Sequence, residues 1–212
     1  VAAVAYSNMI CTNKTQFQTR AGHTIRLRGL NWAEQNLCNE SDMMKMNSWN
    51  VNVIRTWLNE KRWYEEISGK NTYYKLKPLL DWAKKYHVYV LIVLGGIDSA
   101  KPWEDPSLEA KYIAVWESFC SYAKSNEYIL GYEICNEADV DRLNASDLSK
   151  YRAFMERMTD KIRIIDPYHM ICVSGAHGSS IDGLVAGVHI NRANIFYTFH
   201  MYTPVEITRK NT

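Results

Sequence analysis

The chain contains 212 residues, of which 47% are apolar, 23% are charged and 12% are aromatic. This composition is typical of a folded protein with one sizeable core, and it excludes a disordered chain because the net charge is only +2. Lysine and arginine (25) barely outnumber aspartate and glutamate (23), so we expect no nucleic acid partner. The longest apolar stretch, Val88–Leu94, is too short to span a bilayer, so we expect no membrane partner either.

Six short runs of apolar and β-branched residues follow one another along the chain. Runs of four to eight such residues, bounded by polar or glycine positions, are typical of strands. The predicted strands are Ile25–Trp32, Val51–Leu58, Val88–Leu94, Ile129–Asn136, Met170–Ser174 and Ile195–Tyr202.

The longer segments between these runs have apolar residues at helical spacing. The predicted helices are a short methionine-rich helix capped by Ser41, a helix from near Tyr73 to His87, and helices over Pro106–Ser125 and Asp147–Ile165. Pro78 is compatible with the second of these helices only in its first turn. Ser146 or Asp147 can cap the last one.

The alternation of strands and helices predicts an α/β protein, in which a parallel sheet has helices outside it. Two architectures fit this order: a doubly wound sheet and a (β/α) barrel of the TIM type. A nucleotide-binding doubly wound sheet would carry a glycine fingerprint such as GxGxxG after a strand, and none is present. We therefore predict a single (β/α)-barrel domain over residues 1–212 and expect no organic cofactor.

Five cysteines are widely spaced and form no CxxC pair: Cys11, Cys38, Cys120, Cys135 and Cys172. A zinc site and a disulfide framework are therefore both disfavoured, and we interpret the cysteines as buried free thiols. No group of histidine, aspartate and glutamate shows the spacing of a ligand set, so we expect no metal.

The carboxyl ends of the strands are where a (β/α) barrel gathers its active residues. These ends carry Asn31, Trp32, Arg55, Trp57, Asn136, Glu137, His200 and Tyr202. His200 and Tyr202 point to the same face of their strand, because strand side chains alternate. Trp32, Trp57 and Trp103 are interpreted either as core residues or as platforms for sugar rings.

Arg55 shares a strand face with two valines and with Trp57, which places its guanidinium in a cleft or in the interior. A buried arginine needs a carboxylate partner. Glu133 shares a face with Glu137 and is the candidate for that partner.

Four segments together carry a family resemblance: Ile25-Arg-Leu-Arg-Gly-Leu-Asn-Trp32, Asn52-Val-Ile-Arg55, Tyr132-Glu-Ile-Cys-Asn-Glu137 and Tyr197-Thr-Phe-His-Met-Tyr-Thr-Pro204. The chain resembles glycoside hydrolase family 5, which contains cellulases and mannanases on a (β/α)8 barrel. The segments occur in the order of the family and extend from Phe17 to Pro204.

The resemblance implies a role for each matching residue. Glu137 matches the general acid/base, and Asn136 matches the residue that holds the 2-hydroxyl of the sugar. Arg55 matches the arginine beside the nucleophile, and His200 and Tyr202 match residues that shape the cleft near the scissile bond. Retaining enzymes of this kind use two carboxyl groups about 5–5.5 Å apart.

The sequence departs from the family in two places. Leu94-Gly95-Gly96 stands where the family has a histidine after strand three. The nucleophile of the family is a glutamate at the end of strand seven, and the sequence stops at Thr212, shortly after the sixth predicted strand. We therefore expect six of eight β/α units, without the usual nucleophile. Of the other rim carboxylates Glu60, Asp98 and Glu206, Asp98 is the candidate for a second carboxyl.

Three hypotheses of function remain open at this point. The first is a retaining β-1,4-glycan hydrolase, of endoglucanase or mannanase type, whose substrate is a β-linked polysaccharide or oligosaccharide. The second is a carbohydrate-binding barrel remnant without catalysis, and the third is an unrelated (β/α) enzyme such as a phosphate-binding barrel. We expect secretion, which is the usual setting for polymer hydrolysis, and a homo-oligomer that pairs the open edges of the sheet.

Overall fold

A computed structural model describes residues 6–32, 39–58, 76–94 and 101–204. Six strands form a parallel sheet in which each strand lies beside the next one in the sequence, as the alternation predicts. These strands are β4 (Gly29–Trp32), β5 (Val53–Leu58), β6 (Tyr89–Leu94), β7 (Ile129–Glu133), β8 (Met170–Ser174) and β9 (Ile195–Thr198). The α/β prediction is therefore confirmed.

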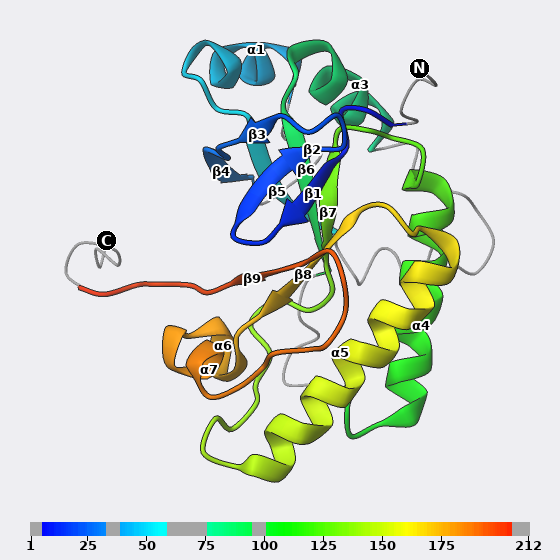
Figure 1. Cartoon of the computed structure of the whole chain (residues 1–212), viewed down its shortest axis with the longest axis vertical. Helices are drawn as coiled ribbons and strands as arrows, with labels where there is room; N and C mark the ends of the chain where they lie inside the picture. Colours follow the sequence, from blue (N-terminus) through cyan, green and yellow to red (C-terminus); the bar gives the residue numbers. More distant parts are fainter. Residues whose placement is uncertain (1–5, 33–38, 59–75, 95–100, 205–212) are drawn as a thin grey trace.

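Helices cover the outer side of this sheet (Figure 1). They are α1 (Glu40–Ser48), α3 (Lys77–Tyr86), α4 (Pro106–Ala123) and α5 (Ala145–Ile165). The short α6 (Ala176–Ser179) and α7 (Ile181–Val185) follow β8 at its carboxyl end. The long helices α4 and α5 run side by side and are joined by an ion pair of 2.7 Å between Arg157 and Glu109. Within the described ranges, no helix combines the length and the hydrophobicity needed to cross a bilayer.

The short helix α1 begins two residues earlier than predicted. Its N-cap is Asn39, not Ser41, because Asn39 is extended and its side chain accepts a hydrogen bond from the Asp42 N–H. The Asp42 carboxylate in turn accepts the Asn39 N–H at 3.1 Å, which completes a capping box.

The helix α5 also begins earlier than predicted, after Asn144, whose side chain accepts the backbone N–H groups of Ser146 and Asp147. These two residues are therefore capped rather than capping. Pro78 lies in the first turn of α3, as the sequence requires. The predicted start of that helix near Tyr73 lies outside the described residues.

Alternating burial along β5 separates the two faces of the sheet. Ile54, Thr56 and Leu58 are buried toward the helices, whereas Arg55 and Trp57 are half-buried on the opposite face. Paired residues of parallel strands share a face of the sheet. Arg55 of β5 pairs with Asn31 of β4 and with Leu91 of β6, so these three residues lie on the same face, which we call the inner face.

Two predicted strands extend too far at their carboxyl ends. The run Ile129–Asn136 is a strand only to Glu133, and the run Ile195–Tyr202 is a strand only to Thr198. The residues that follow leave the ladder as loops, and Glu137 adopts a φ of 45° that a strand does not permit. This early end matters for function, because it turns the last residues of each run into rim residues.

An antiparallel sheet that was not predicted precedes the parallel one. It contains β1 (Ile10–Asn13), β2 (Gln16–Thr19) and β3 (Thr24–Ile25), so that the predicted strand Ile25–Trp32 is in fact divided between β3 and β4. Phe17 packs edge-on against Phe196 of β9, with ring centroids 5.5 Å apart.

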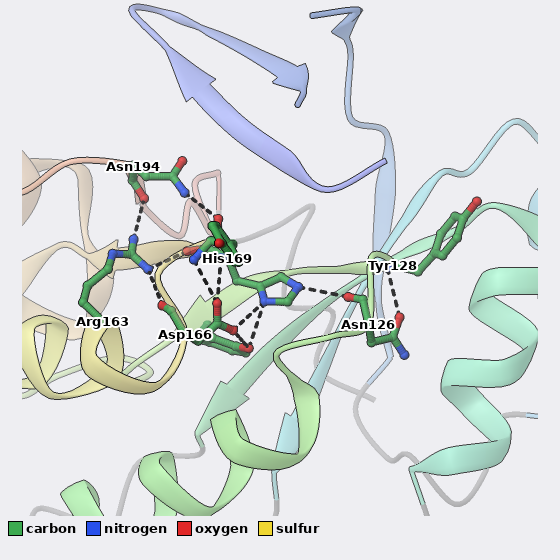
Figure 2. Close-up of polar contacts among 8 residues, drawn as sticks. Asn126, Tyr128, Arg163, Asp166, His169 and Asn194 are labelled. Atoms are coloured by element: carbon green, nitrogen blue, oxygen red, sulfur yellow. Dashed lines mark hydrogen bonds and ion pairs between the residues drawn. The ribbon is translucent and has the colours of Figure 1, made fainter. Parts of the chain in front are cut away.

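A buried polar network lies in the turn between α5 and β8, at the amino end of the sheet (Figure 2). Both ring nitrogens of His169 are engaged: Nδ1 lies 2.6 Å from the Asp166 carboxylate, and Nε2 lies 2.9 Å from the carbonyl oxygen of Asn126. The Tyr132 hydroxyl donates to the same carboxylate. Asp166, His169 and Tyr132 are fully buried, so this network holds α5, β7 and β8 together without access to solvent.

The same turn is held by Arg163. Its guanidinium donates to the carbonyl oxygens of Asp166, His169, Ala193 and Asn194, at 2.7 to 3.4 Å. Arg163 therefore ties the start of β8 to the start of β9.

Most of the described cysteines are buried and free. Cys120, Cys135 and Cys172 are buried thiols, which confirms the prediction for these three. Burial raises the pKa of Cys120 and Cys172 well above the ordinary value, so neither thiol ionises readily. Cys11 is free but only half-buried, and Cys38 lies outside the described residues.

Candidate active site

Four polar side chains meet at the carboxyl end of the inner face. Arg55 of β5 donates through Nε and Nη2 to the two carboxylate oxygens of Glu133 on β7, at 2.8 Å each. The same Nη2 donates to Asn136 Oδ1 at 2.8 Å, and Nη1 donates to Asn31 Oδ1 at 3.4 Å. The predicted partner of Arg55 is therefore confirmed, and the guanidinium also gathers both rim asparagines.

The Arg55–Glu133 pair is shielded from water, because the side chain of Glu133 is 0% exposed and that of Arg55 is 14% exposed. Burial lowers the pKa of Arg55, but the hydrogen bonds and charge of Glu133 more than offset that effect, so its pKa is raised. Ser174, at the end of β8, donates a third hydrogen bond of 2.9 Å to Glu133. With its oxygens occupied and buried, Glu133 is a structural anion and not an attacking group.

Asn136 is 9% exposed, and its amide oxygen faces Arg55. An amide whose oxygen is occupied leaves its NH₂ group as the available donor. Asn136 can therefore donate a hydrogen bond to a hydroxyl group, which is the chemistry that the family resemblance assigns to it.

Glu137 and His200 form a second pair on the rim. Glu137 Oε1 lies 2.7 Å from Nδ1 of His200, and the side chains are 43% and 17% exposed, respectively. One edge of the Glu137 carboxyl group is thus held by the imidazole, while the group as a whole faces solvent. A carboxyl group with this exposure can exchange a proton with a bound ligand, which the buried Glu133 cannot do.

The predicted aromatic residues divide into rim and core. Tyr202 is 45% exposed, and its ring lies edge-on to His200 at 6.3 Å. Trp57 is half-buried against the Arg55 guanidinium, 4.8 Å from Cζ to the ring centroid, and therefore lies beside the polar site. Trp32 is half-buried at the end of β4, and its register with Thr56 places it on the helix-facing side of the sheet.

Trp103 lies in the core instead of on the rim, which corrects its interpretation as a sugar platform. It is 7% exposed and packs edge-on against Tyr151 of α5, with ring centroids 5.1 Å apart. A ring whose edges and faces are covered by α5 offers no surface for a sugar to stack on.

The predicted substitute for a second carboxyl, Asp98, lies outside the described residues, as do Glu60 and Glu206. Within the described residues, no group of three histidine, cysteine, aspartate or glutamate side chains could hold a metal ion. The chemistry available in this part of the chain is therefore that of a carboxyl group, an imidazole, an amide and a fixed guanidinium.

Sequence reasoning missed the part played by Ser174 in this site. Serine at the end of a strand is common, and its contact with Glu133 joins residues 41 positions apart. One signal could have identified Ser174. It lies at the carboxyl end of β8, on the strand face that points toward Glu133.

Solved structures of similar fold include a β-glucanase and an endoglucanase. A β-glucanase of Saccharophagus degradans, solved in complex with cellotetraose, is 19% identical and superposes with a TM-score of 0.74 over 92% of this chain and 62% of its own. The native form of that β-glucanase gives a TM-score of 0.72 at 19% identity, over 89% of this chain and 60% of its own. The catalytic domain of a Thermobifida fusca endoglucanase is 20% identical, with a TM-score of 0.71 over 92% and 65%. This chain thus spans less than two thirds of the length of each of these proteins.

No curated protein matches the sequence. The cellulase family, glycosyl hydrolase family 5, matches residues 12–212, which is nearly the whole chain. The barrel-type α/β fold of the similar structures agrees with that match. The chain belongs to the cellulase family, glycosyl hydrolase family 5.

Proposed function

We propose that this chain is part of a retaining β-1,4-glycan hydrolase of endoglucanase type, with Glu137 as the general acid/base. The observation that supports this proposal is the pairing of a solvent-facing Glu137 carboxyl group with His200 at 2.7 Å, next to the buried Arg55–Glu133 pair. The cellotetraose bound to the Saccharophagus β-glucanase supports a β-glucan as the ligand. A mannan is the alternative substrate.

In the proposed reaction, Glu137 gives its proton to the glycosidic oxygen while the nucleophilic carboxylate that a retaining mechanism requires bonds to the anomeric carbon and the glycosidic bond breaks. The negative charge that remains on Glu137 is then stabilised by a hydrogen bond from Nδ1–H of His200. Asn136 donates from its amide NH₂ group to the 2-hydroxyl of the sugar, and Arg55 holds Asn136 in that orientation. In the second half of the reaction, Glu137 takes a proton from water, and the water oxygen bonds to the anomeric carbon and displaces the nucleophilic carboxylate.

A retaining mechanism needs a second carboxyl group about 5–5.5 Å from the first. The family resemblance places that nucleophile after a seventh strand, whereas the described sheet contains six. Glu133 does not fill the role, because its oxygens already accept three hydrogen bonds in the interior. In this proposal the usual nucleophile is not among the residues assigned to the site.

The alternative is a carbohydrate-binding barrel that holds a glycan without cleaving it. The half-exposed Tyr202 and the half-buried Trp57 favour this second function, because aromatic rings bind sugar faces without any need for a nucleophile.

One experiment separates the two functions. Soluble cellulose and mannan are incubated with the chain and with its Glu137→Gln variant, and reducing ends and cellotetraose affinity are measured on the same samples. If the parent chain hydrolyses the glycan and Glu137→Gln does not, while both bind cellotetraose, the result supports the hydrolase function. Binding without reducing ends in both proteins supports the binding barrel. Equal hydrolysis by both proteins contradicts the assignment of Glu137.

Two further expectations belong to this proposal. We propose that the protein is secreted, since its substrate is a polymer. Within the described residues, β4 and β9 are the outermost strands of the parallel sheet, so we also propose that these edges mediate association of copies. A single monomeric mass by light scattering at micromolar concentration would contradict the association.

A further inference from the structure

Ser179 contacts the backbone of both members of the Glu137–His200 pair. Its hydroxyl oxygen accepts the backbone N–H of Glu137 at 3.2 Å, and its carbonyl oxygen accepts the backbone N–H of His200 at 2.7 Å. Ser179 is itself 0% exposed. One buried residue thus joins two rim segments that are 63 positions apart in the sequence.

The backbone on both sides of this contact is in the left-handed region. Ser179 has a φ of 58°, His177 a φ of 53° and Glu137 a φ of 45°. Such values are unfavourable for residues other than glycine, so they persist only where surrounding contacts impose them. Here the contacts are a ladder: His177 N–H donates to Val140 O, and Gly178 N–H donates to Ala138 O, each at 3.1 Å. The segment after β8 is therefore held against the segment that carries Glu137.

Ser180, which follows Ser179 in the sequence, contacts a different part of the chain. The Ser180 hydroxyl accepts the Gly183 N–H at 3.0 Å and caps α7. Among the described residues, Ser180 makes no hydrogen bond to Glu137 or His200, whereas Ser179 contacts both. The two adjacent serines therefore offer a matched comparison between a rim contact and a helix cap.

We propose that Ser179 is a positioning residue for the acid/base, an inference that rests on the proposed function. Ser179 does not reach the substrate; it fixes the backbone at Glu137 and at His200, and so sets the distance between Glu137 Oε1 and His200 Nδ1. Removal of the hydroxyl leaves the Glu137 N–H without its partner and lets the carboxyl group move away from the imidazole. The loss therefore falls on the proton transfer and not on glycan binding.

The test compares the full chain with Ser179→Ala, Ser179→Gly, Ser180→Ala and Glu137→Gln. The ring ¹⁵N signals of His200 are recorded by NMR, and kcat and KM are measured on a soluble glucan. We expect both Ser179 variants to shift the His200 signals toward their positions in Glu137→Gln, and to lower kcat by roughly 5- to 20-fold with KM within about twofold. Ser180→Ala should keep the His200 signals and kcat of the parent chain. Because glycine relieves the left-handed backbone, Ser179→Gly keeps the test valid should the alanine variant fold poorly.

The outcomes separate this inference from the proposed function. If Ser179→Ala and Ser179→Gly keep the His200 signals of the parent while Glu137→Gln moves them, Ser179 is not a positioning residue. Unchanged His200 signals in Glu137→Gln overturn the pair itself and the inference with it. Full hydrolysis by Glu137→Gln overturns the acid/base assignment instead. Since the NMR readout needs no turnover, it decides the role of Ser179 even in a chain that binds glycan without cleaving it.

Discussion

Arg55 and Glu133 meet across the intervening strand β6, in a two-point ion pair whose two hydrogen bonds are each 2.8 Å long. Side chains from alternate strands fill the same layer inside a (β/α) barrel, which is why residues of β5 and β7 can touch in front of β6. The pair stands below the rim and fixes Asn136 from beneath.

Arg55→Met should destabilise the fold strongly, because it leaves the Glu133 carboxylate buried without its cation. We expect a loss of about 3–5 kcal/mol in the free energy of unfolding, measured by urea denaturation. Arg192→Met is the control, since Arg192 pairs with Asp160 at the surface, where solvent screens the pair, and its loss should lower the free energy of unfolding far less. A double variant, Arg55→Met with Glu133→Leu, should recover much of the stability and none of the hydrolysis. If Arg55→Met and Arg192→Met lower the free energy of unfolding by the same amount, the burial argument is wrong.

Under the proposed function, Asn136→Ala should remove a preference for sugars that carry a 2-hydroxyl group. The amide NH₂ of Asn136 is the donor left available by Arg55, so the parent chain should prefer an aryl β-cellobioside over its 2-deoxy analogue. In the alanine variant the two substrates should give similar kcat/KM values. A preference that survives in the variant would show that another group reads this hydroxyl.

Trp103→Ala should reduce stability and leave glycan affinity unchanged, because the ring is buried against Tyr151 and Phe154. Deletion of a buried tryptophan typically costs about 3–5 kcal/mol. Trp49 is 61% exposed, so Trp49→Ala should change the free energy of unfolding by less than about 0.5 kcal/mol. Thermal unfolding and cellotetraose titration of both variants check this prediction. Weakened binding by a fully stable Trp103→Ala would restore the platform interpretation.

Asp166 should make the protein sensitive to acid. Burial raises the pKa of this carboxyl, but hydrogen bonds and charge from His169, with the Tyr132 hydroxyl, outweigh burial and lower it to about 2. A carboxyl whose pKa is lowered in the folded state stabilises that state above its ordinary pKa, and the contribution is lost as the pH falls toward 2. We expect the parent chain to lose about 2 kcal/mol of stability from this group between pH 4 and pH 2.

Denaturation at several pH values checks this expectation. Asp166→Asn should be less stable at neutral pH and should show a flatter dependence between pH 4 and pH 2. Asp81→Asn, at an exposed carboxylate paired with Lys77, should keep the acid dependence of the parent chain. If the free energy of unfolding of Asp166→Asn falls as steeply between pH 4 and pH 2 as that of the parent chain, then groups other than Asp166 cause the acid sensitivity.

The sequence predicts the sheet because its strands are short apolar runs, and β5 adds an alternation of buried and half-buried residues. Arg55 could be assigned to the inner face from that alternation, since alternate residues of a strand face the same side. Glu137 could be assigned from its place just after a strand, where the carboxyl ends meet. The hairpin β1–β2 escapes prediction because its four-residue strands, such as Gln16–Thr19, contain mostly polar residues. Helix caps were misplaced by two to three residues for a related reason, because asparagine and serine compete for the same role.

Contacts between residues that are far apart in the sequence could not be predicted from local sequence patterns. Trp103 carries no signal that distinguishes a buried ring from a platform, and only the packing of α5 decides it. Ser174 and Ser179 act on partners about 40 residues away, through a hydroxyl group that is common in any chain. A local pattern cannot indicate such partners.

The parallel order of the sheet also has a consequence for the order in which the site assembles during folding. Arg55 and Glu133 are 78 residues apart, and Glu137 and His200 are 63 residues apart. Parallel strands cannot be joined by a tight turn, so each of these contacts forms only after the helices between the strands have folded and packed. Folding of such non-local contacts is slow. Because β9 is synthesised after the other five strands of the described parallel sheet, Arg55 and Glu133 can pair before His200, the partner of Glu137, has been made.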